Sequence, residues 1–563
     1  MHSHKVLNIA LAQAPLQESL SKELGISKIL AQVLINRGLR DFKSAGEFLN
    51  IKVDNFLDPS SLPDMDKAVG FLKAAAKNKE KVMICGDYDA DGITAVALLK
   101  GSLLSQGLDV THYLPHRIKD GYGLNKNIIR LAKQNNIKIL ITVDCGISNH
   151  KEISELKKNG IATIVTDHHE PASIGLPEAF CIINPKLKDC GYKFRDLAGV
   201  GVAYKLCQAM SNSRLLEELD LVALGTIADS VPLKGENRII AREGLLRFPR
   251  TKRPGLQALI ENAGLKAEQK FTSTFISFII GPRINASGRM DTAEESLRLL
   301  MSQDRPEAEA LAKSLEAFNR QRQKVESRIM GEAEDLINRE VNFKEQKIIV
   351  IAKEDWHQGV LGIVASKLAD KFYRPAIVIS LNDTLCKGSA RSIKNFHLFE
   401  ALKECQQFLN AFGGHSHAAG LVISKESIDD FRRHINRLAS DALSIEDLLP
   451  SIDIDMELSF ADINEMMIAE LGSLEPFGTG NPEPLFLSRN LKLKSQPQVL
   501  GRETLKFWVT DGAFTYQAIG FGMANLKESL IEANSFDLVY TPRLDTWKEE
   551  SGILLEIEEI FLR

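Results

Sequence analysis

The chain has 563 residues, of which 44% are hydrophobic and 26% are charged, and its net charge is −4. This length exceeds what one hydrophobic core usually supports, so we expect two to four domains. The charge excludes a globally basic polyanion-binding protein, and no apolar run approaches the roughly 20 residues that span a bilayer. Any nucleic-acid surface must therefore be a local groove of Lys and Arg.

The seven cysteines are odd in number, have no CxxC spacing and stand mostly in apolar surroundings. This pattern is typical of reduced packing residues in a reducing compartment. The amino end has a weak apolar run but no charged start, long apolar core and small-residue cleavage site, so we interpret it as mature sequence. Together these features predict a cytoplasmic protein without a membrane partner.

Residues 5 to about 55 are predicted to be helical. Apolar residues recur there at helical spacing, namely Leu24, Ile26, Ile29, Leu30, Val33, Leu34 and Leu39, and residues 41–49 predict a further short helix. A link rich in Pro and Asp follows. We therefore expect an N-terminal helical segment over residues 1–60 that serves packing rather than chemistry.

From Lys67 the pattern alternates between helices and apolar strands, which predicts a parallel sheet over residues 61–235. The expected strands are 81–85, 110–114, 137–143 and 161–166. Ligands of parallel sheets bind beyond the carboxyl ends of the strands. It matters, then, that acidic or imidazole side chains follow three of these strands.

The stretch GDYDADG places Asp87, Asp89 and Asp91 directly after the first strand. Alternate side chains of an extended strand end point the same way, so three carboxylates converge and need a compensating positive charge. A divalent metal is the obvious candidate. For this stretch alone, a solvated acidic turn or a helix N-cap is an equal alternative.

Asp144 follows the third strand, and Asp167, His168 and His169 follow the fourth. Taken singly, Asp144 has the alternative of a turn cap, and the histidines that of an exposed pair. Their joint placement at one sheet edge argues against coincidence. Carboxylates mixed with imidazole select Mn²⁺ or Mg²⁺ more readily than structural zinc. Two such ions about 3.5–4 Å apart would hydrolyse a phosphate ester.

Residues 236–340 are predicted to form a helical linker, with one long connecting helix over 293–339. Within it, the segment GPRINASGRM presents Arg283, Asn285 and Arg289 among small residues. Such a segment lets a guanidinium approach a phosphate closely.

A second α/β lobe is expected over residues 341–445, starting with a strand, a helix and a strand. It contains Ser389 and Arg391 in KGSARS, and His415 and His417 in GGHSHAAG. Glycines beside hydroxyl and imidazole groups suit a surface that binds phosphate or ribose. The alternative is a tight turn with a buried histidine.

The tail, residues 446–563, contains short strand-like runs separated by turns, which predicts a small β-barrel. Its aromatic residues Phe507, Trp508, Tyr516 and Trp547 are candidates for stacking on single-stranded bases. Core packing is the alternative for each of them.

The pieces GDYDADG, VDCG and TDHH, in this order, resemble the DHH phosphoesterase family, which is named after the Asp-His-His triplet. Further matching motifs extend the resemblance over nearly the whole chain: HRIKDGYGLN, ALGTIADSVPL, GPRINASGRM, DWHQGVLGIVASKL, KGSARS and FGGHSHAAG. They are similar to the bacterial members that are exonucleases specific for single-stranded DNA. The resemblance implies an α/β fold, with a parallel-sheet lobe and a second α/β lobe joined by a long helix, and a C-terminal OB-like β-barrel.

The resemblance also implies the residues of the site. Two sets of metal ligands share a bridging residue: Asp87, Asp89 and Asp144 for one ion, and Asp91, Asp144, His168 and Asp229 for the other. His169 would face the scissile phosphate, and Asp167 would orient the site. The residues expected to contact nucleic acid are Arg117, Arg283, Asn285, Arg289, Ser389, Arg391, His415 and His417.

By resemblance, the chain is expected to be a 5′→3′ exonuclease that uses two Mn²⁺ or Mg²⁺ ions to release nucleotide monophosphates from single-stranded DNA. The implied setting is recombination and mismatch repair, with single-strand-binding protein and a helicase as partners. Two alternatives stay open. A hydrolase of short oligonucleotides or cyclic dinucleotides usually lacks the helical preface and β tail, and a catalytically silent replication scaffold would lack metal ligands that are complete here.

Overall fold

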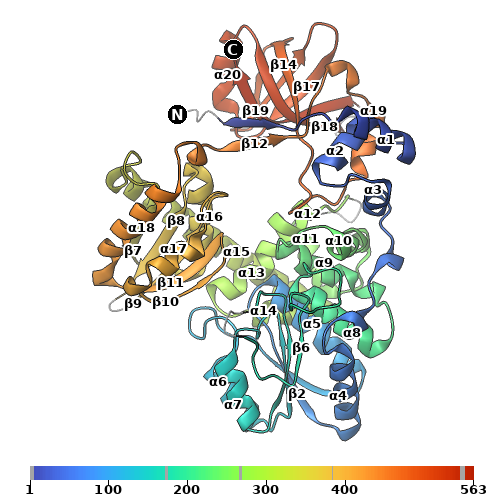
Figure 1. Cartoon of the computed structure of the whole chain (residues 1–563), viewed down its shortest axis with the longest axis vertical. Helices are drawn as coiled ribbons and strands as arrows, with labels where there is room; N and C mark the ends of the chain where they lie inside the picture. Colours follow the sequence, from blue (N-terminus) through green and yellow to red (C-terminus); the bar gives the residue numbers. More distant parts are fainter. Residues whose placement is uncertain (1–4, 172–174, 266–268, 383–384, 546–551) are drawn as a thin grey trace. The chain divides into compact units, whose positions relative to one another are not determined.

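The computed structural model, drawn in Figure 1, describes residues 5–171, 175–265, 269–382, 385–545 and 552–563. The chain divides into two compact units. The first unit comprises Phe56–Val231 and Glu243–Pro450. The second comprises the described residues up to Asn55, Pro232–Arg242 and the residues from Ser451 onward. Helix α10 (Gly235–Arg247) therefore contributes residues to both units.

The first unit contains the predicted parallel sheet, with strand order β3-β2-β4-β5-β6. Its strands are β2 (Lys81–Cys85), β3 (Asp109–Tyr113), β4 (Ile139–Val143), β5 (Ala162–Thr166) and β6 (Cys181–Ile183). One face is covered by α4 (Met65–Asn78), α5 (Ala90–Ser105) and α8 (Gly199–Ser211), and the other by α6 (Lys126–Gln134) and α7 (His150–Lys158). Because both faces are covered, the central strand β4 is buried throughout.

A helical region follows the sheet. It comprises α9 (Leu219–Ala228), α10, α11 (Pro254–Asn262), α12 (Ser273–Phe275), the π-helix η5 (Ile276–Ile280), α13 (Gly281–Met290), α14 (Glu294–Met301) and α15 (Arg305–Glu340). The prediction of one helix over 293–339 is wrong at one point, since the helix ends at Met301 and restarts at Arg305. Asp304 caps the new helix by accepting from Glu307 N at 2.9 Å, and a proline in its first turn favours the start.

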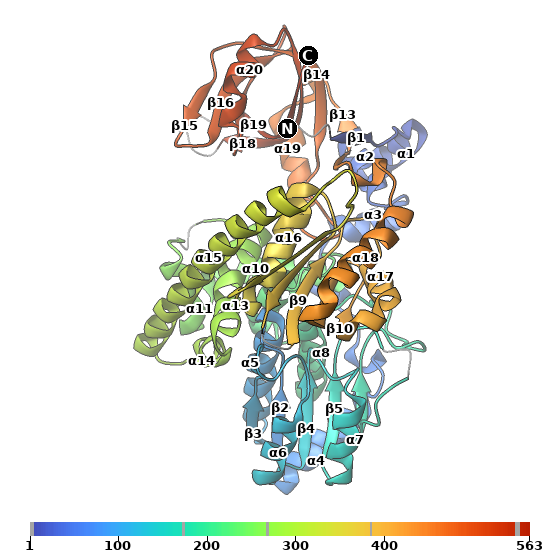
Figure 2. The same cartoon turned by 90° about the vertical axis from the view of Figure 1, so that its left-hand side faces the viewer.

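The second α/β lobe of this unit has a five-stranded mixed sheet in the order β10-β11-β9-β8-β7. Its strands are β7 (Ile349–Glu354), β8 (Ala376–Leu381), β9 (Leu385–Arg391), β10 (Leu409–Gly414) and β11 (Ala418–Ser424). Helices α15 and α16 (Leu361–Phe372) pack on one face, and α17 (Leu398–Glu404) and α18 (Ile428–Ala442) on the other (Figure 2). The expected lobe joined by a long helix is thus confirmed.

In the second unit, residues 6–9 form a strand, β1 (Val6–Ile9), which pairs in parallel with β12 (Ser451–Ile454). The prediction that residues 5–55 are helical is therefore wrong at its start, because a distant strand supplies the backbone partners. The helices α1 (Ala14–Leu24), α2 (Lys28–Asn36) and α3 (Phe42–Leu49) follow as predicted.

The β tail contains β13 (Met456–Glu457), β14 (Phe486–Leu493), β15 (Gln498–Leu500), β16 (Thr504–Thr510), β17 (Thr515–Gly520), β18 (Phe536–Asp545) and β19 (Gly552–Leu562), with α19 (Glu465–Gly472) before β14 and α20 (Lys527–Glu532) before β18. Five of these strands pair in a ring, β14-β18-β19-β17-β16. The ring closes between β16 and β14 through only two residue pairs, so the sheet is OB-like with a short closing seam.

The tail aromatics differ from one another in exposure. Phe507 is 2% exposed and packs edge-on against Phe536, so the stacking role considered for it is wrong. The hydroxyl of half-buried Tyr516 donates to two backbone carbonyls, whereas Trp508 is 41% exposed. Trp547 lies outside the described residues.

Arg238 of α10 is a buried cation in the second unit. Its guanidinium donates to the carbonyls of Phe48, Ser473, Leu474 and Pro476 at 2.8–3.3 Å and lies 3.9 Å from the Phe48 ring. These contacts join all three chain segments of the unit around one side chain.

In the described part of the chain, no helix has both the length and the apolarity needed to cross a membrane.

Candidate metal centre

The acidic stretch after β2 begins the site. Asp89 caps helix α5, because its Oδ1 accepts from the backbone N–H groups of Asp91 and Gly92 at 3.0 and 3.2 Å. The helix N-cap, which the sequence offered as an alternative to a metal site, is therefore present, and the carboxylates cluster as well. Gly92 is required here, since a Cβ at this position would lie 2.6 Å from the backbone of Asp87.

The amino end of α8 holds a second carboxylate. Asp91 accepts from Gly199 N and Val200 N, each at 2.7 Å. A Cβ on Gly199 would lie 2.6 Å from the Cβ of Asp144, so the glycine allows the helix to approach both carboxylates. Helix α8 therefore fixes the spacing between the ends of β2 and β4.

The structure brings all six candidate ligands together. Three groups have ligand atoms within 4.8 Å of one another: Asp87, Asp89 and Asp144; Asp91, His168 and Asp229; and Asp144, His168 and His169. His168 Nε2 lies 3.1 Å from Asp144 Oδ1, 3.7 Å from Asp229 Oδ2 and 4.0 Å from Asp91 Oδ2. Asp229, which caps the carboxyl end of α9, thus reaches the sheet edge from a helix rather than a strand.

The electrostatics of this cluster favour a bound cation. Burial and the charge of Asp89 raise the pKa of Asp87 to about 8 and that of Asp91 to about 7. Burial, followed by repulsion from Asp91, also raises the pKa of Asp144 and of Asp229 well above the usual range. Neighbouring cations such as Arg117, which lowers the pKa of Asp87, do not offset these effects.

Three of the converging atoms are buried without a hydrogen-bond partner, namely Asp87 Oδ1, Asp144 Oδ1 and His168 Nε2. Burial and neighbouring His169 lower the pKa of His168 to about 3, so its ring is neutral and able to act as a ligand. Buried polar atoms normally have a partner. Oxygen and imidazole donors of this kind fit Mn²⁺ or Mg²⁺.

Asp167 holds the catalytic candidate His169. Its Oδ1 accepts from the backbone of His168 and His169 and lies 2.8 Å from His169 Nδ1, while its Oδ2 accepts from Ile147 N. Burial lowers the pKa of His169, but the bond with Asp167 outweighs it and raises that pKa. Asp167 therefore orients the histidine.

Three arginines near the acidic stretch, Arg117, Arg289 and Arg391, act on one another electrostatically. The Arg117 guanidinium stacks 3.9 Å from the Tyr88 ring, and Arg289 donates to Gly359 O at 3.1 Å. Burial and the charge of Arg117 lower the pKa of Arg289, to about 9, and that of Arg391. Among the described residues, no carboxylate forms an ion pair within 4 Å of these three cations, although the charge of Asp89 acts on Arg289 and that of Arg117 on Asp87.

The other predicted nucleic-acid residues have different surroundings. Asn285 Oδ1 accepts from Ala90 N at 2.8 Å and thereby steadies the acidic loop, and Arg283 is ion-paired with Glu316 at 2.8 Å. Ser389 lies 3.5 Å from Arg391 in β9. His415 stacks on His169 with ring centroids 6.2 Å apart, and His417 is exposed.

Two residues at the site were not found from the sequence. Asn184 donates to His169 O at 2.9 Å, and Tyr122 contacts both Asp144 and His169. Asn184 directly follows β6, a strand that the sequence did not predict. Ligands of parallel sheets bind beyond the carboxyl ends of the strands, so a predicted strand over residues 181–183 would have made Asn184 a candidate. Tyr122 had no such local signal.

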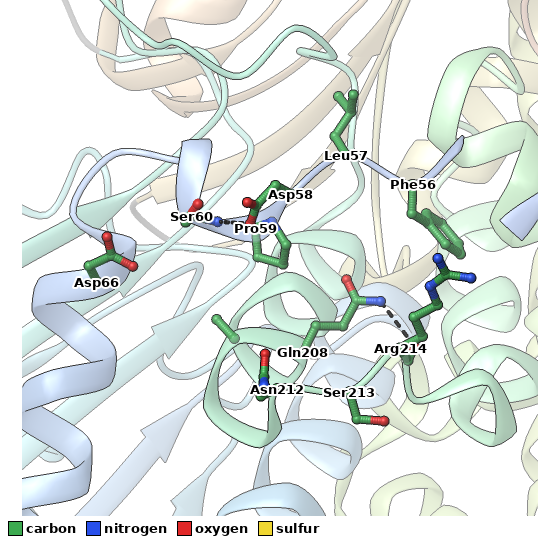
Figure 3. Close-up of a pocket in the computed structure, with 11 residues that line it drawn as sticks. Phe56, Leu57, Asp58, Pro59, Ser60, Asp66, Gln208, Asn212, Ser213 and Arg214 are labelled. Carbon is green, nitrogen blue, oxygen red and sulfur yellow. Dashed lines mark hydrogen bonds between the residues drawn. The ribbon is translucent and has the colours of Figure 1, made fainter. Parts of the chain in front are cut away.

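A separate hollow of about 380 Å³ lies in the same unit, between residues 56–60 and the carboxyl end of α8 (Figure 3). Phe56, Asp58, Gln208 and Arg214 line it, and Gln208 donates to Arg214 O at 3.0 Å. None of the predicted site residues reaches this hollow, so the chemistry belongs to the sheet edge.

Three protein families match this chain. Residues 81–226 match the DHH family, N-terminal domain, residues 345–441 the DHHA1 domain, and residues 454–559 the RecJ OB domain. A single-stranded-DNA-specific exonuclease RecJ of Bacillus subtilis is 39% identical over 96% of this chain and 69% of its own length. That of Escherichia coli is 35% identical over 89% of this chain and 90% of its own length. The chain belongs to the RecJ family.

Solved structures of the family agree. The structure titled RecJ in complex with Mn²⁺ from Thermus thermophilus has a TM-score of 0.86 and 28% identity, and the match covers 100% of this chain and 80% of that one. A second, titled exonuclease RecJ bound to manganese, has a TM-score of 0.59 and 34% identity, and covers 69% of this chain and 98% of that one. The fold expected from the sequence, including the OB-like tail, is thus confirmed.

Proposed function

We propose that this protein is a single-stranded-DNA-specific exonuclease that degrades its substrate from the 5′ end with two divalent ions, Mn²⁺ or Mg²⁺. The observation that carries the proposal is the convergence of five carboxylates and a neutral histidine at one sheet edge, in a family whose members are named for this activity. Structures of a relative are titled as complexes with Mn²⁺ and with Mg²⁺.

The observed groups of neighbouring ligand atoms support two proposed sets of ligands. Asp87, Asp89 and Asp144 would hold one ion, and Asp91, Asp144, His168 and Asp229 the other, with Asp144 shared. The bound pair would supply an activated water and would neutralise charge on the attacking and leaving oxygens. The Asp91 carboxylate would already be oriented for metal binding, because two N–H groups of α8 fix it.

His169 is the proposed catalytic residue beside the ions. Its Nδ1 is occupied by Asp167, which leaves Nε2 to steady the scissile phosphate or the attacking water. Asp167 would act by fixing the ring, since four hydrogen bonds already use its oxygens. The hydrogen bond to Asp167 keeps a proton on Nδ1.

Arg117, Arg289, Arg391 and Ser389 are the proposed phosphate contacts. Three guanidiniums without carboxylate partners repel one another, and an anionic group bound among them would relieve this repulsion. A terminal phosphate held there would place the first phosphodiester bond at the ions and so impose 5′→3′ polarity. Arg283, Asn285, His415 and His417 are proposed as further contacts along the backbone, and Trp508 as a base-stacking platform.

The function is tested with single-stranded DNA labelled separately at its 5′ and 3′ ends and incubated with Mn²⁺ or Mg²⁺. The expected result is immediate release of labelled mononucleotide from the 5′ end only, with no digestion of a blunt duplex. Hydrolysis of dinucleotides or cyclic dinucleotides without DNA digestion would keep the metal centre and refute the substrate. Failure to cleave any phosphoester would favour a scaffold.

Replacing Arg391 with Ala tests the phosphate site. We expect KM for 5′-phosphorylated DNA to rise about 10- to 100-fold, since a hydrogen bond to a charged group contributes about 1.5–3 kcal/mol. KM for a 5′-hydroxyl strand should change little. Arg298→Ala is the control, because Arg298 forms an exposed ion pair with Glu307. Equal losses on both strands would refute the assignment.

The wider setting is also a proposal. A cytoplasmic location is supported by the seven cysteines, none of which forms a disulfide. Single-strand-binding protein and a helicase are proposed partners in recombination and repair, because both present single strands. We further propose that the chain has five parts. They are the N-terminal helical segment (1–60), the parallel-sheet lobe (61–235), the helical linker (236–340), the second α/β lobe (341–445) and the OB-like tail (446–563).

A further inference from the structure

Tyr122 lies in the loop between β3 and α6 and is 47% exposed. An exposed tyrosine usually directs its hydroxyl toward water, whereas this hydroxyl donates to the backbone carbonyl of Asp144 at 2.9 Å. It also lies 3.2 Å from His169 Nδ1. One side chain thus contacts the shared ligand candidate and the catalytic candidate together.

The carbonyl that Tyr122 binds belongs to a residue with an unusual backbone. Asp144 has a φ of +60°, in the left-handed region, where a non-glycine residue costs about 1–3 kcal/mol unless its surroundings hold it. The N–H of Asp144 donates to Thr166 O at 3.1 Å, and the Tyr122 hydroxyl holds its carbonyl. The Asp144 carboxylate is therefore aimed by a backbone that is fixed from both sides.

The contact with His169 restricts the orientation of the imidazole. The Tyr122 and His169 rings meet edge to face, with centroids 5.7 Å apart at 71°. Because the hydroxyl donates its proton to Asp144 O, its oxygen is able to accept from His169 Nδ1–H, which Asp167 also accepts. Tyr122 and Asp167 together hold the same ring nitrogen.

The loop that carries Tyr122 is anchored on both of its sides. Asp120 accepts from the Tyr113 hydroxyl, His116 N and Asn127 Nδ2 at 2.9–3.0 Å. Lys387 of the second lobe donates to Ile118 O at 2.9 Å. The position of the Tyr122 hydroxyl is thus determined by the fold around it.

We propose that Tyr122 is a positioning residue that fixes the Asp144 carboxylate and the His169 ring for hydrolysis. This inference rests on the proposed exonuclease function. The proposed role belongs to the Tyr122 hydroxyl and not to its ring. Tyr122→Phe therefore removes the hydroxyl contacts with Asp144 and His169 and keeps the packing of the ring.

The experiment compares wild type, Tyr122→Phe and Tyr113→Phe as full chains. Digestion of 5′-phosphorylated single-stranded DNA gives kcat and KM, and calorimetry without DNA gives the affinity for Mn²⁺. For Tyr122→Phe we expect kcat to fall about 10- to 100-fold, with KM changed less than about threefold and with weaker Mn²⁺ binding, as is usual when a partner of a ligand is lost. Raising the Mn²⁺ concentration should restore part of kcat.

Tyr113→Phe removes one of the three hydrogen bonds to Asp120, but it leaves both site contacts and the loop anchors made by His116, Asn127 and Lys387, so it should retain kcat and Mn²⁺ affinity. The inference is overturned if Tyr122→Phe matches wild type, if Tyr113→Phe loses as much, or if KM rises while Mn²⁺ affinity stays constant. A wild type that binds Mn²⁺ but digests no DNA would refute the proposed function alone. The Mn²⁺ affinity of Tyr122→Phe would then still decide the inference.

Discussion

Replacing Asp144 with Asn should reduce digestion of single-stranded DNA on the order of 10³-fold or more, because one change weakens both proposed ion sites. The substitution is nearly isosteric, and Asn tolerates the φ of +60° found at this residue. The fold should therefore survive while the chemistry is lost. The measurement is the initial rate of mononucleotide release with saturating Mn²⁺.

The thermal stability of the same variant should depend on metal less than that of wild type. Without metal, the buried Asp144 carboxylate is repelled by Asp91 and Asp89, so removing its charge should raise Tm, at about 2–4 °C per kcal/mol. Adding Mn²⁺ should raise the Tm of wild type and have little effect on the variant. Asp189→Asn, at an exposed position of the same lobe, is the matched control. Retained activity in Asp144→Asn would contradict the assignment of the shared ligand.

Replacing Arg238 with Met should destabilise the second unit by about 3 kcal/mol or more. Four backbone carbonyls would lose a charged donor in a buried site, and each unmet acceptor costs about 1–3 kcal/mol. Met keeps much of the aliphatic volume, so the loss reports the hydrogen bonds. The measurement is the free energy of unfolding from urea titration, monitored by tryptophan fluorescence.

Lys234→Met is the control for this change, because Lys234 is exposed just before the same helix. It should leave the free energy of unfolding within about 0.5 kcal/mol of wild type. Equal stability of the Arg238 and Lys234 variants would show that the buried guanidinium does not join the three segments.

The sheet edge was predictable because the signals that define it are local. Alternating helices and apolar strands predict parallel β2, β4 and β5, and the residues directly after these strands are Asp87 to Asp91, Asp144 and His168. Asp229 came only from the family resemblance, since it reaches the site from the end of α9 and no strand precedes it.

Other features depend on contacts that a local pattern does not contain. β1 is a strand because β12 supplies its partner, with Asn8 bound to Asp453 across 445 positions of sequence. Tyr122 reaches Asp144 through the tertiary fold of its loop. The burial of Phe507 had a local signal, because Leu505, Phe507 and Val509 alternate with more exposed residues in β16.

The second unit consists of three separate segments of the chain, and this affects how it folds during synthesis on the ribosome. The helices that precede Asn55 are made first, yet the apolar surfaces of Leu30, Val33 and Leu34 belong to a core completed by strands after Ser451. The nascent chain must therefore carry exposed hydrophobic helices while hundreds of residues are added. A chaperone bound early to the amino-terminal helices would prevent aggregation until the last strands emerge.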